Sequence, residues 1–528
     1  MNYAVIGTGG IGGYYGARLA AAGKEVSFLL RSDYEQVRDH GLRVDSVKGD
    51  IFLPTVNAYK SAGDMPKTDV VLVCLKTGSN SSIPELIRPI LGPESVVVLI
   101  QNGLGMERDL SEAMPEARII GATAFICSSK VAPGHIEHTG YGELTLAPFS
   151  DGLSPALEAI VSDMEASGVP CHLCPSLELM RWKKLVWNIP YNGMSVTENC
   201  RTDVLTFEPA LRGRVIALMH EVIAAAGACG VEIPEDFVGA MVSSTENMEP
   251  YYPSMFLDHA AGRRMEIESI YARPVAEAWK HGFDMPLTRE VMRGLRESEG
   301  LHEYDMGPGV EAFSTTRDAL LPYPVVQAHQ THGVEVALID RPDITREELE
   351  GIDAMMTDNR GIAIGARTAD CIPVLMYDPV RQAVAAVHSG WRGTVARIVS
   401  NAIEALSINY GTKAEDLRVV IGPGIQKASF QVGEEVATAF KQAGFPLDRV
   451  WSFDGPQAPS TSDDAPKSMA GGHHIDLVEA IRFALSESGV PEENVTSCGI
   501  DTFLTPEFFS ARREGFHCGR IINAIRLL

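Results

Sequence analysis

The sequence predicts an α/β protein of three domains: α/β at 1–170, helical at 171–298 and α/β again at 310–528, after a linker at 299–309. Three observations predict this class. The length of 528 residues argues for about three domains at roughly 100 to 200 residues each. Apolar strand-like runs alternate with helical periodicity at both ends of the chain, whereas the middle is helical. Hydrophobic residues make up 45% and charged residues 22%, as in an ordinary globular protein.

The chain opens with a strand YAVIG, a glycine-rich turn and helix, and a second strand EVSFLLR. Within this βαβ unit, Gly7, Gly9 and Gly12 have the G-x-G-x-x-G spacing, with Gly10 and Ile11 between them. Such glycines allow a tight turn, a close approach of the backbone to a pyrophosphate, and close helix packing. The segment therefore predicts a Rossmann domain whose first helix binds a dinucleotide at its N-terminus.

The ends of the next strands predict further cofactor contacts. An NAD enzyme usually has an acidic residue after the second strand, but this chain has Arg31, 19 residues after Gly12. A cation there suits the 2′-phosphate of NADP(H), although Arg31 as a surface residue at the strand end is the alternative. Two more buried strands, TDVVLVCLKT and SVVVLIQNGLG, end at Lys76 and Asn102. Ligands bind at this edge of such sheets.

The helical domain carries a pattern of lysine and asparagine in the segment WKKLVWNIPYN. Lys184 and Asn188 are four residues apart and so project from one helix face. Asn192 continues that face, but Pro190 intervenes and is expected to bend the axis. Lys183, one step round the helix, is the competing candidate for a catalytic role.

The motifs GTGGIGGYYG, LKT, QNGLG, WKKLVWNIPYN and RRMEIES, together with Arg31, resemble the ketopantoate reductase (2-dehydropantoate 2-reductase) family over residues 1 to about 298. The resemblance implies that Lys184 is the catalytic lysine and that Glu266 orients or anchors the site. It also implies substrate contacts from Asn102, Asn188, Asn192 and Ser254. The chain departs from the family at Ile270-Tyr271-Ala272, which leaves other 2-oxo acids open as substrates.

The chemistry of ketone reduction accounts for a lysine at this position. Hydride transfer leaves negative charge on the carbonyl oxygen, and a nearby ammonium stabilises that charge and donates the proton. We expect Lys184 to have this role and Glu266 to hold it by charge pairing. A solvated Lys184–Glu266 ion pair without a catalytic role is the alternative.

The second half returns to an α/β pattern. Its strand-like runs are VEVALID, GIAIGAR, IPVLMYDP, QAVAAVHSG and LRVVIGPG, and its helical segments include TREELEGIDAMM and VGEEVATAFKQAG. An insertion at 454–474, rich in Pro, Ser, Asp and Gly, is expected to be a loop. We expect its adjacent His473 and His474 to be solvated rather than to bind a metal.

Three residues of types that bind metals occur at predicted strand ends: His332, Cys371 and His388. Two His and one Cys would form a zinc site with an open position, as in catalytic sites. From spacing alone, packing residues are the alternative, and His329 is a substitute ligand for His332.

The strings QTHG, RTADCIPV, AVHSGWRGT, IGPGI, FQVGEEV and FFSARREG resemble the laccase-domain family, once called polyphenol oxidases and now regarded as purine nucleoside phosphorylases with adenosine deaminase activity. The resemblance covers about 305 to 528. It implies a metal at His332, Cys371 and His388, zinc with copper as the alternative, and cleavage of adenosine or inosine by phosphate. From the chemistry of guanidinium groups, Arg392, Arg512 or Arg513 would contact phosphate, with surface positions as the alternative. The chain departs from the family in its short connection DALLPYPVVQAH, at Ala428-Ser429-Phe430 and at Asp501-Thr502.

Charge and composition narrow the partners. Lys and Arg number 45 against 69 Asp and Glu, for a formal net charge of -24, which disfavours nucleic acid and anionic membranes as partners. No stretch has the roughly 18 to 20 apolar residues of a membrane helix, and the N-terminus lacks the pattern of an export signal. Nine scattered Cys form no disulfide framework. We therefore expect a cytoplasmic enzyme with small-molecule substrates, and an oligomer is compatible with the sequence.

These observations predict a bifunctional fusion that reduces 2-dehydropantoate with NADPH and cleaves purine nucleosides with phosphate, with deamination as an added activity. The alternative is a reductase of another 2-oxo acid whose C-terminal half is a metal-binding interaction module without turnover.

Overall fold

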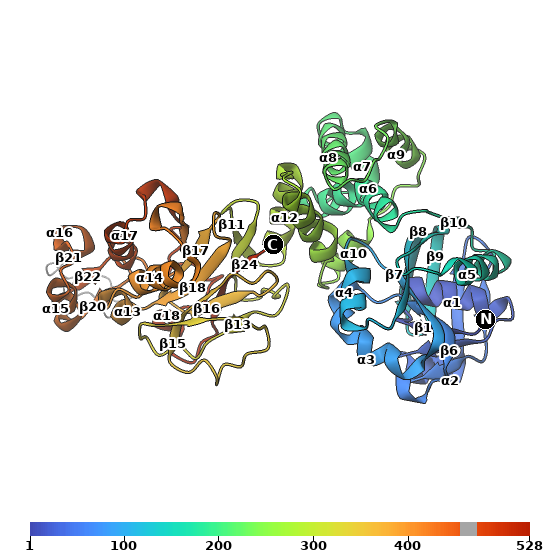
Figure 1. The fold of residues 1–528 in the computed structure, drawn as a ribbon, viewed down its shortest axis with the longest axis horizontal. Helices are drawn as coiled ribbons and strands as arrows, with labels where there is room; N and C mark the ends of the chain where they lie inside the picture. The colour runs from blue at the N-terminus through green and yellow to red at the C-terminus, as the bar shows by residue number, and fades with distance from the viewer. Residues whose placement is uncertain (455–471) are drawn as a thin grey trace, which may run out of the picture. The chain divides into compact units, whose positions relative to one another are not determined.

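The computed structural model describes residues 1–454 and 472–528. It divides the chain into two compact units, residues 1–292 and 293–528, which are described separately (Figure 1). Most of the insertion expected at 454–474 lies outside the described residues. The predicted α/β class is confirmed in both units.

Unit 1 is built on a ten-stranded sheet of order β4-β3-β9-β8-β7-β6-β1-β2-β5, with β10 paired to β9. Strands β5, β2, β1, β6, β7 and β8 run parallel to one another, and β9 is antiparallel to β8. The strands are β1 (Tyr3–Ile6), β2 (Val26–Leu29), β3 (Leu42–Ser46), β4 (Ile51–Leu53), β5 (Asn57–Tyr59), β6 (Thr68–Val73), β7 (Leu91–Ile100), β8 (Arg118–Ala132), β9 (His135–Pro148) and β10 (Cys171–Leu173).

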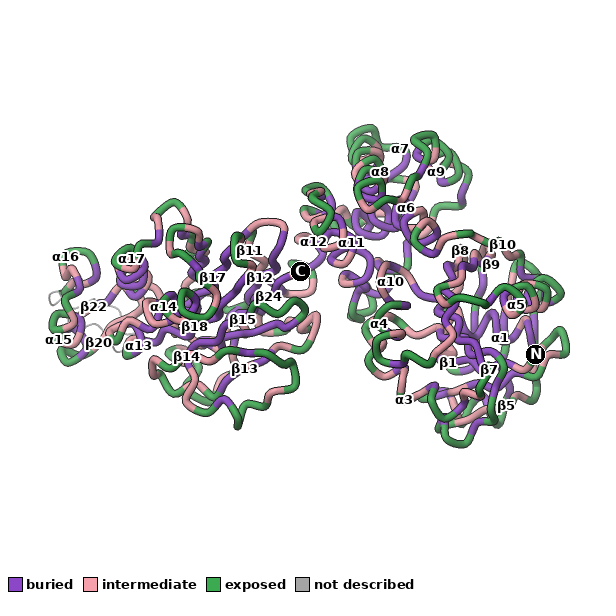
Figure 2. The backbone as a smooth tube through the Cα atoms, viewed as in Figure 1, coloured by how far each residue is buried: buried purple, intermediate pink, exposed green. Residues whose placement is uncertain are grey.

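The parallel strands are apolar on both faces because helices cover both sides of the sheet. Tyr3 and Val5 of β1 belong to one buried cluster, and Ala4 and Ile6 belong to another. Figure 2 shows this burial concentrated in the strands. The helices of this part are α1 (Gly10–Ala21), α2 (Tyr34–His40), α3 (Ile83–Ile87), α4 (Met106–Ala113) and α5 (Ser154–Ala166).

The helical part of unit 1 begins at Leu177, since residues 171–173 add a strand to the sheet. Its longest helix, α6, continues past Pro190, so Asn192 stays on the same helix as Lys184. The helices are α6 (Leu177–Thr197), α7 (Thr202–Phe207), α8 (Pro209–Ala228), α9 (Asp236–Glu246), α10 (Ser254–Ala260) and α11 (Arg273–Lys280), with a π-helical turn η4 (Glu268–Ala272) before α11. Helix α12 (Pro286–Ser298) begins in unit 1 and ends in unit 2.

Unit 2 contains two larger sheets and a small three-stranded one. The five-stranded sheet has the order β11-β12-β24-β16-β13, the six-stranded sheet β14-β15-β18-β17-β19-β23, and the small sheet β20-β22-β21. The first strands are β11 (Leu301–Tyr304), β12 (Val310–Thr315), β13 (Val326–Gln327), β14 (Glu335–Leu338), β15 (Ile352–Thr357), β16 (Ile364–Thr368), β17 (Ile372–Asp378) and β18 (Ala383–Ser389). The others are β19 (Arg418–Ile421), β20 (Gln431–Val432), β21 (Trp451–Phe453), β22 (His473–Ile475), β23 (Val495–Ser497) and β24 (Ile521–Leu527).

Unit 2 packs in layers. Alternate residues of the six-stranded sheet, such as Leu375 and Ala386, pack against Ile364 and Ile525 of the five-stranded sheet. Residues on its other face, such as Val374, pack against helices α14 and α17. The helices are α13 (Trp391–Val395), α14 (Ile398–Tyr410), α15 (Glu434–Gln442), α16 (Leu447–Val450), α17 (Leu477–Glu487) and α18 (Ala511–Glu514).

Two local expectations were wrong, and a third segment has more regular structure than its composition indicates. The segment TREELEGIDAMM, predicted to be helical, holds strand β15, because Gly351 has a φ of +79° and the residues after it pair with β18. The segment predicted to be a linker, 299–309, includes strand β11, which pairs with β12; its bounds as a linker stay a prediction. His473 and His474 lie in β22; His473 accepts a hydrogen bond from Trp451, and the Nδ1 of His474 lies 3.0 Å from the Lys427 carbonyl oxygen.

Candidate active sites

The glycine turn of unit 1 has the shape that a dinucleotide site requires. Gly7 has a φ of +97°, and a Cβ atom at Gly12 would lie 2.4 Å from the Gly7 carbonyl oxygen, so side chains at both positions are excluded. Nothing lies within 4 Å of a Cβ built on Gly9, which leaves the turn open to a ligand. Helix α1 starts at Gly10, and its N-terminal N–H groups favour an anion there.

Arg31 lies two residues beyond the end of β2 and is exposed. Its guanidinium makes no ion pair with the part of the chain that the structure describes. An unpaired cation at the end of the second strand has the charge and place expected for a 2′-phosphate contact.

A cavity of about 440 Å³ extends from the glycine turn to the helical part of unit 1. Gly9, Gly10 and Ile11 of the glycine turn are among its lining residues. The other sequence-predicted residues that line it are Lys76, Asn102, Lys184, Asn188, Asn192, Ser254 and Glu266. The fold thus brings together residues from positions 9 to 266 in one cavity, while Arg31 is not among its lining residues.

Lys184 is half-buried in the cavity wall. Its Nζ lies 4.8 Å from the centre of the Phe125 ring and 5.8 Å from that of Trp187. Burial lowers the pKa of this ammonium to about 8, so the group can give up a proton near neutral pH. Lys183, the competing candidate, instead lies 5.3 Å from the Phe237 ring and does not line the cavity.

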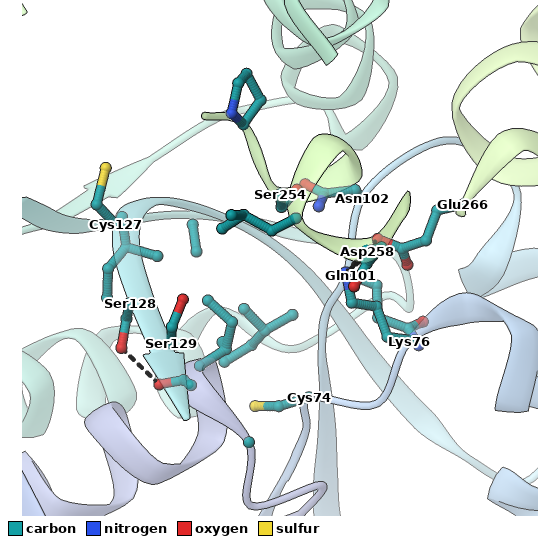
Figure 3. A pocket seen from close by; sticks show the side chains of 18 of the residues that line it. Cys74, Lys76, Gln101, Asn102, Cys127, Ser128, Ser129, Ser254, Asp258 and Glu266 are labelled. Carbon is teal, nitrogen blue, oxygen red and sulfur yellow. Dashed lines mark hydrogen bonds and ion pairs between the residues drawn. The ribbon is translucent and has the colours of Figure 1, made fainter. Parts of the chain in front are cut away.

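The carboxylate of Glu266 does not make the expected pair with Lys184. It lies 3.5 Å from the Nζ of Lys76 and accepts hydrogen bonds from the N–H and hydroxyl of Thr77 at 3.0 and 3.1 Å. Asp258 contacts the same ammonium at 2.7 Å. Figure 3 shows these acids and Lys76 together on one side of the cavity. Burial opposes the charge of Lys76, but Glu266 and Asp258 outweigh it and raise its pKa.

The asparagines form a polar wall. The Nδ2 of Asn188 donates to the Oδ1 of Asn102 at 3.5 Å. The Oδ1 of Asn192 accepts from the N–H of Met255 at 3.4 Å, which holds α6 against the start of α10, where Ser254 lies exposed. Asn188 and Asn192 are each 2% exposed, so the amide groups are fixed in place before a substrate binds.

The sequence reasoning missed Arg181, which lies one turn of α6 before Lys184. Its buried guanidinium pairs with Glu107 and donates to the carbonyl oxygens of Gln101, Ala122 and Leu99. These contacts tie α6 to the ends of the strands that carry Asn102. In sequence, a buried arginine cannot be distinguished from a surface arginine, so no signal pointed to it. Asp258 was also missed, because the sequence does not distinguish a buried aspartate from a surface aspartate.

In unit 2, His332, Cys371 and His388 lie together. Their candidate ligand atoms are all within 4.8 Å of one another, the one such group of three or more among the described residues. His388 is the next-to-last residue of β18, and Cys371 directly precedes β17. A Cβ atom on Gly390 would lie 2.8 Å from the His332 ring and 3.1 Å from the Cys371 sulfur. His329 is exposed and pairs with Glu350 instead.

A buried carboxylate, missed in the sequence, supports this trio. The Oδ1 of Asp353 lies 2.7 Å from the Nδ1 of His388. The same carboxylate accepts hydrogen bonds from the backbone N–H groups of Thr331, His332 and Gly333 at 3.1, 3.0 and 2.7 Å. His332 has a φ of +64°, which these bonds hold.

The donor set suits a metal. With its Nδ1 facing Asp353, His388 has Nε2 free as a ligand, the usual arrangement of a histidine that binds zinc. Burial opposes the ionisation of Cys371, but the charge of His388 and hydrogen bonds from both histidines lower the pKa of its thiol to about 6. A thiolate is the form that binds metal. One sulfur and two nitrogen donors with an open position fit zinc better than several copper ions.

The three arginines expected near phosphate have different surroundings. The guanidinium of Arg513 donates to the carbonyl oxygens of Thr502, Phe503, Thr505 and Phe508, so it stabilises a loop. Arg512 donates to the carbonyl oxygen of Gln431 at 3.0 Å. Arg392 is exposed, and its guanidinium carbon lies 4.4 Å from the centre of the Trp391 ring. Of the three, Arg513 is the least suited to bind phosphate, because its guanidinium already donates to four backbone carbonyl oxygens.

Comparison with known families divides the chain in the same way. The family described as "Ketopantoate reductase PanE/ApbA" matches residues 3–151, and its "C terminal" family matches 176–299. The family described as "Multi-copper polyphenol oxidoreductase laccase" matches residues 310–528. Within the described residues, no helix has the length and apolarity to cross a membrane.

Individual proteins agree with these matches. A 2-dehydropantoate 2-reductase of Nostoc sp. is 45% identical over 304 residues, which are 57% of this chain and 95% of the relative. A purine nucleoside phosphorylase of Bacteroides thetaiotaomicron is 41% identical over 206 residues, 38% of this chain and 72% of the relative. The crystal structure of a 2-dehydropantoate 2-reductase from Geobacter metallireducens, 36% identical, has a TM-score of 0.55 and covers 56% of this chain and all of its own.

Proposed function

Because the chain belongs to the ketopantoate reductase family over residues 3–151 and 176–299, and to the polyphenol oxidoreductase laccase family over 310–528, we propose that it is a bifunctional enzyme. Unit 1 reduces 2-dehydropantoate to pantoate with NADPH. Unit 2 cleaves purine nucleosides with phosphate.

For unit 1, the position of Lys184 carries the proposal. This ammonium faces a cavity that reaches the glycine turn, and its lowered pKa suits proton donation. NADPH, when bound, supplies the hydride. The N-terminus of α1 and Arg31 hold the cofactor phosphates, and Lys184 donates a proton to the ketone oxygen as negative charge develops there.

The polar wall opposite the glycine turn orients the substrate. Asn102, Asn188, Asn192 and Ser254 offer the donors and acceptors that the carboxylate and hydroxyl of a 2-oxo acid require. Glu266 acts through Lys76 rather than through Lys184, because it neutralises and positions the Lys76 ammonium. Glu266 is therefore a positioning residue in this proposal.

Steady-state NADPH oxidation across a series of 2-oxo acids tests the substrate. We expect the highest kcat/KM with 2-dehydropantoate. A higher kcat/KM with another 2-oxo acid would support the alternative reductase and contradict the proposed substrate.

For unit 2, the His332, Cys371 and His388 trio carries the proposal. These residues would hold a zinc ion, with copper as the alternative, and such an ion supplies a Lewis acid when bound. In phosphorolysis a phosphate oxygen bonds to C1′ of the ribose while the C1′–N9 bond breaks. The electron pair leaves with the purine, which takes up a proton, and ribose 1-phosphate is the second product. The buried Asp353 keeps the His388 ring in a fixed orientation throughout.

A deaminase activity is the second candidate, because a relative named adenosine deaminase RL5 is 38% identical and is covered over 74% of its length. Incubation of the full-length protein with adenosine distinguishes the activities. Phosphorolysis gives equal amounts of adenine and ribose 1-phosphate and requires phosphate, whereas deamination gives inosine without it. Protein that contains metal but releases none of these products would support the alternative of an interaction module.

A further inference from the structure

We propose that Arg346, Arg367 and Arg520 form an anion site beside the metal-binding trio of unit 2, and that its ligand is inorganic phosphate. The inference rests on the phosphorolysis proposed above, for which it names the phosphate subsite. It replaces Arg513, whose guanidinium is committed to loop carbonyl oxygens.

The backbone brings the three arginines to one end of a sheet. Arg367 is the next-to-last residue of β16, and Ile521 of β24 pairs with Thr368, so Arg520 comes immediately before this paired end. The Oε1 of Gln330 accepts a hydrogen bond from the N–H of Arg367 at 2.7 Å, and its Nε2 donates one to the Arg367 carbonyl oxygen at 2.9 Å. The turn that contains Gln330 is thereby fixed against the end of β16.

The segment that contains Arg346 contacts the same turn. The N–H of Leu349 donates to the Arg346 carbonyl oxygen at 3.2 Å, and the N–H of His329 donates to the Leu349 carbonyl oxygen at 3.1 Å. Segment 346–349 and residues 329–330 are therefore in direct contact, which places Arg346 and Arg367 on segments that both bond to this turn.

The guanidinium groups lack the partners that arginines usually have. In the described part of the chain, the side chains of Arg346 and Arg367 make no hydrogen bond or ion pair. Arg520 donates only to main-chain oxygens and the sulfur of its own loop, such as those of Cys518 and Phe516 at 2.6 and 3.0 Å. Burial and the like charges of Arg346 and Arg520 lower the pKa of Arg367.

A bound anion would remove this repulsion. In a chain with a net charge of -24, carboxylates are abundant, yet none forms an ion pair with these three groups among the described residues. Planar guanidinium groups bond phosphate oxygens in pairs. Three positive charges without a neutralising acid would attract an anion such as hydrogen phosphate, which carries two negative charges.

The same short segments also contain the metal ligands. Gln330 is two residues before His332, and Arg367 is four residues before Cys371. Asp370, which lies between Arg367 and Cys371 in the sequence, has a φ of +88°. Its carboxylate accepts hydrogen bonds from the Thr502 hydroxyl at 2.8 Å and from the N–H of Arg512 at 2.7 Å. Phosphate at the arginines would thus be next to the segments that contain the candidate metal ligands.

Titration calorimetry of the full-length protein with inorganic phosphate tests the site. We expect Arg367→Gln and Arg346→Gln each to weaken phosphate binding by roughly 10- to 100-fold, the usual effect of a hydrogen bond to a charged group. Arg381→Gln is the matched control, because this exposed arginine is in the β17–β18 turn, at the other end of those strands from Cys371. Arg346 is exposed on a loop, so its replacement leaves the fold intact even if Arg367→Gln does not.

The outcomes separate this inference from the proposed reaction. Loss of phosphate binding in the two variants but not in Arg381→Gln would support the site. Wild-type affinity in Arg346→Gln and in folded Arg367→Gln, or no phosphate binding by the unmodified protein, would overturn it. If phosphate binds at the arginines but adenosine gives no ribose 1-phosphate, the site stands and the proposed phosphorolysis fails.

Discussion

Burial lowers the pKa of the Lys184 ammonium to about 8, so reductase activity should fall as the pH rises through that value. An ordinary lysine has a pKa of about 10.4 and would stay protonated over this range. If the protonated form of Lys184 is the proton donor, the enzyme is active below this pKa and loses activity above it.

The expected decline follows from the pKa. A group with a pKa near 8 is about 90% protonated at pH 7 and about 10% at pH 9, so kcat/KM should decrease about 10-fold between these values. Lys184→Ala removes the proton donor altogether and should cost roughly 10²- to 10⁴-fold in kcat. NADPH binding should change little, because the proposed phosphate contacts come from the glycine turn and Arg31 rather than from Lys184.

The assay is NADPH oxidation with 2-dehydropantoate over a pH series, with NADPH affinity measured by fluorescence. Lys184→Arg keeps a cation with a pKa above about 12, so the decline near pH 8 should disappear even though the rate is lower. Lys183→Ala is the matched control, since the neighbouring ammonium lies over Phe237 and outside the cavity.

Two results would refute this reasoning. A decline with the same midpoint in Lys184→Arg would mean that another group titrates. A loss in Lys183→Ala as large as in Lys184→Ala would assign the proton donor to the wrong lysine.

Asp353→Asn should weaken zinc binding roughly 10- to 100-fold, because His388 loses the carboxylate that orients it; competition with a chelator measures this, and an unchanged affinity would contradict the role. Arg31→Ala should raise the KM for NADPH about 10-fold or more through loss of a charged contact and leave the KM for NADH nearly unchanged; an equal effect on both would place the 2′-phosphate elsewhere. Arg181→Met should lower the free energy of unfolding by about 3 to 5 kcal/mol, since it leaves Glu107 as a buried unpaired charge. Urea denaturation tests this, and the double replacement with Glu107→Leu should recover most of the loss.

The local sequence was enough to predict the glycine turn and the lysine-bearing helix of unit 1. Glycine spacing after β1 predicted the dinucleotide turn, and the four-residue spacing of Lys184 and Asn188 predicted that both face the same side of one helix. These features depend on backbone geometry over a few residues, which the sequence encodes directly. The His332, Cys371 and His388 grouping came from motifs rather than spacing, because its members are separated by loops and strands.

By itself, then, the sequence determined the fold class, the glycine turn and the face of α6 that carries Lys184. Only the tertiary structure decided which groups meet across that fold. Glu266 pairs with Lys76 rather than Lys184, and the buried Asp353 supports His388. Periodicity determines which way a side chain points, but the partner it meets depends on how distant strands and helices pack, and that packing decides which charges are neutralised and which remain free for a ligand.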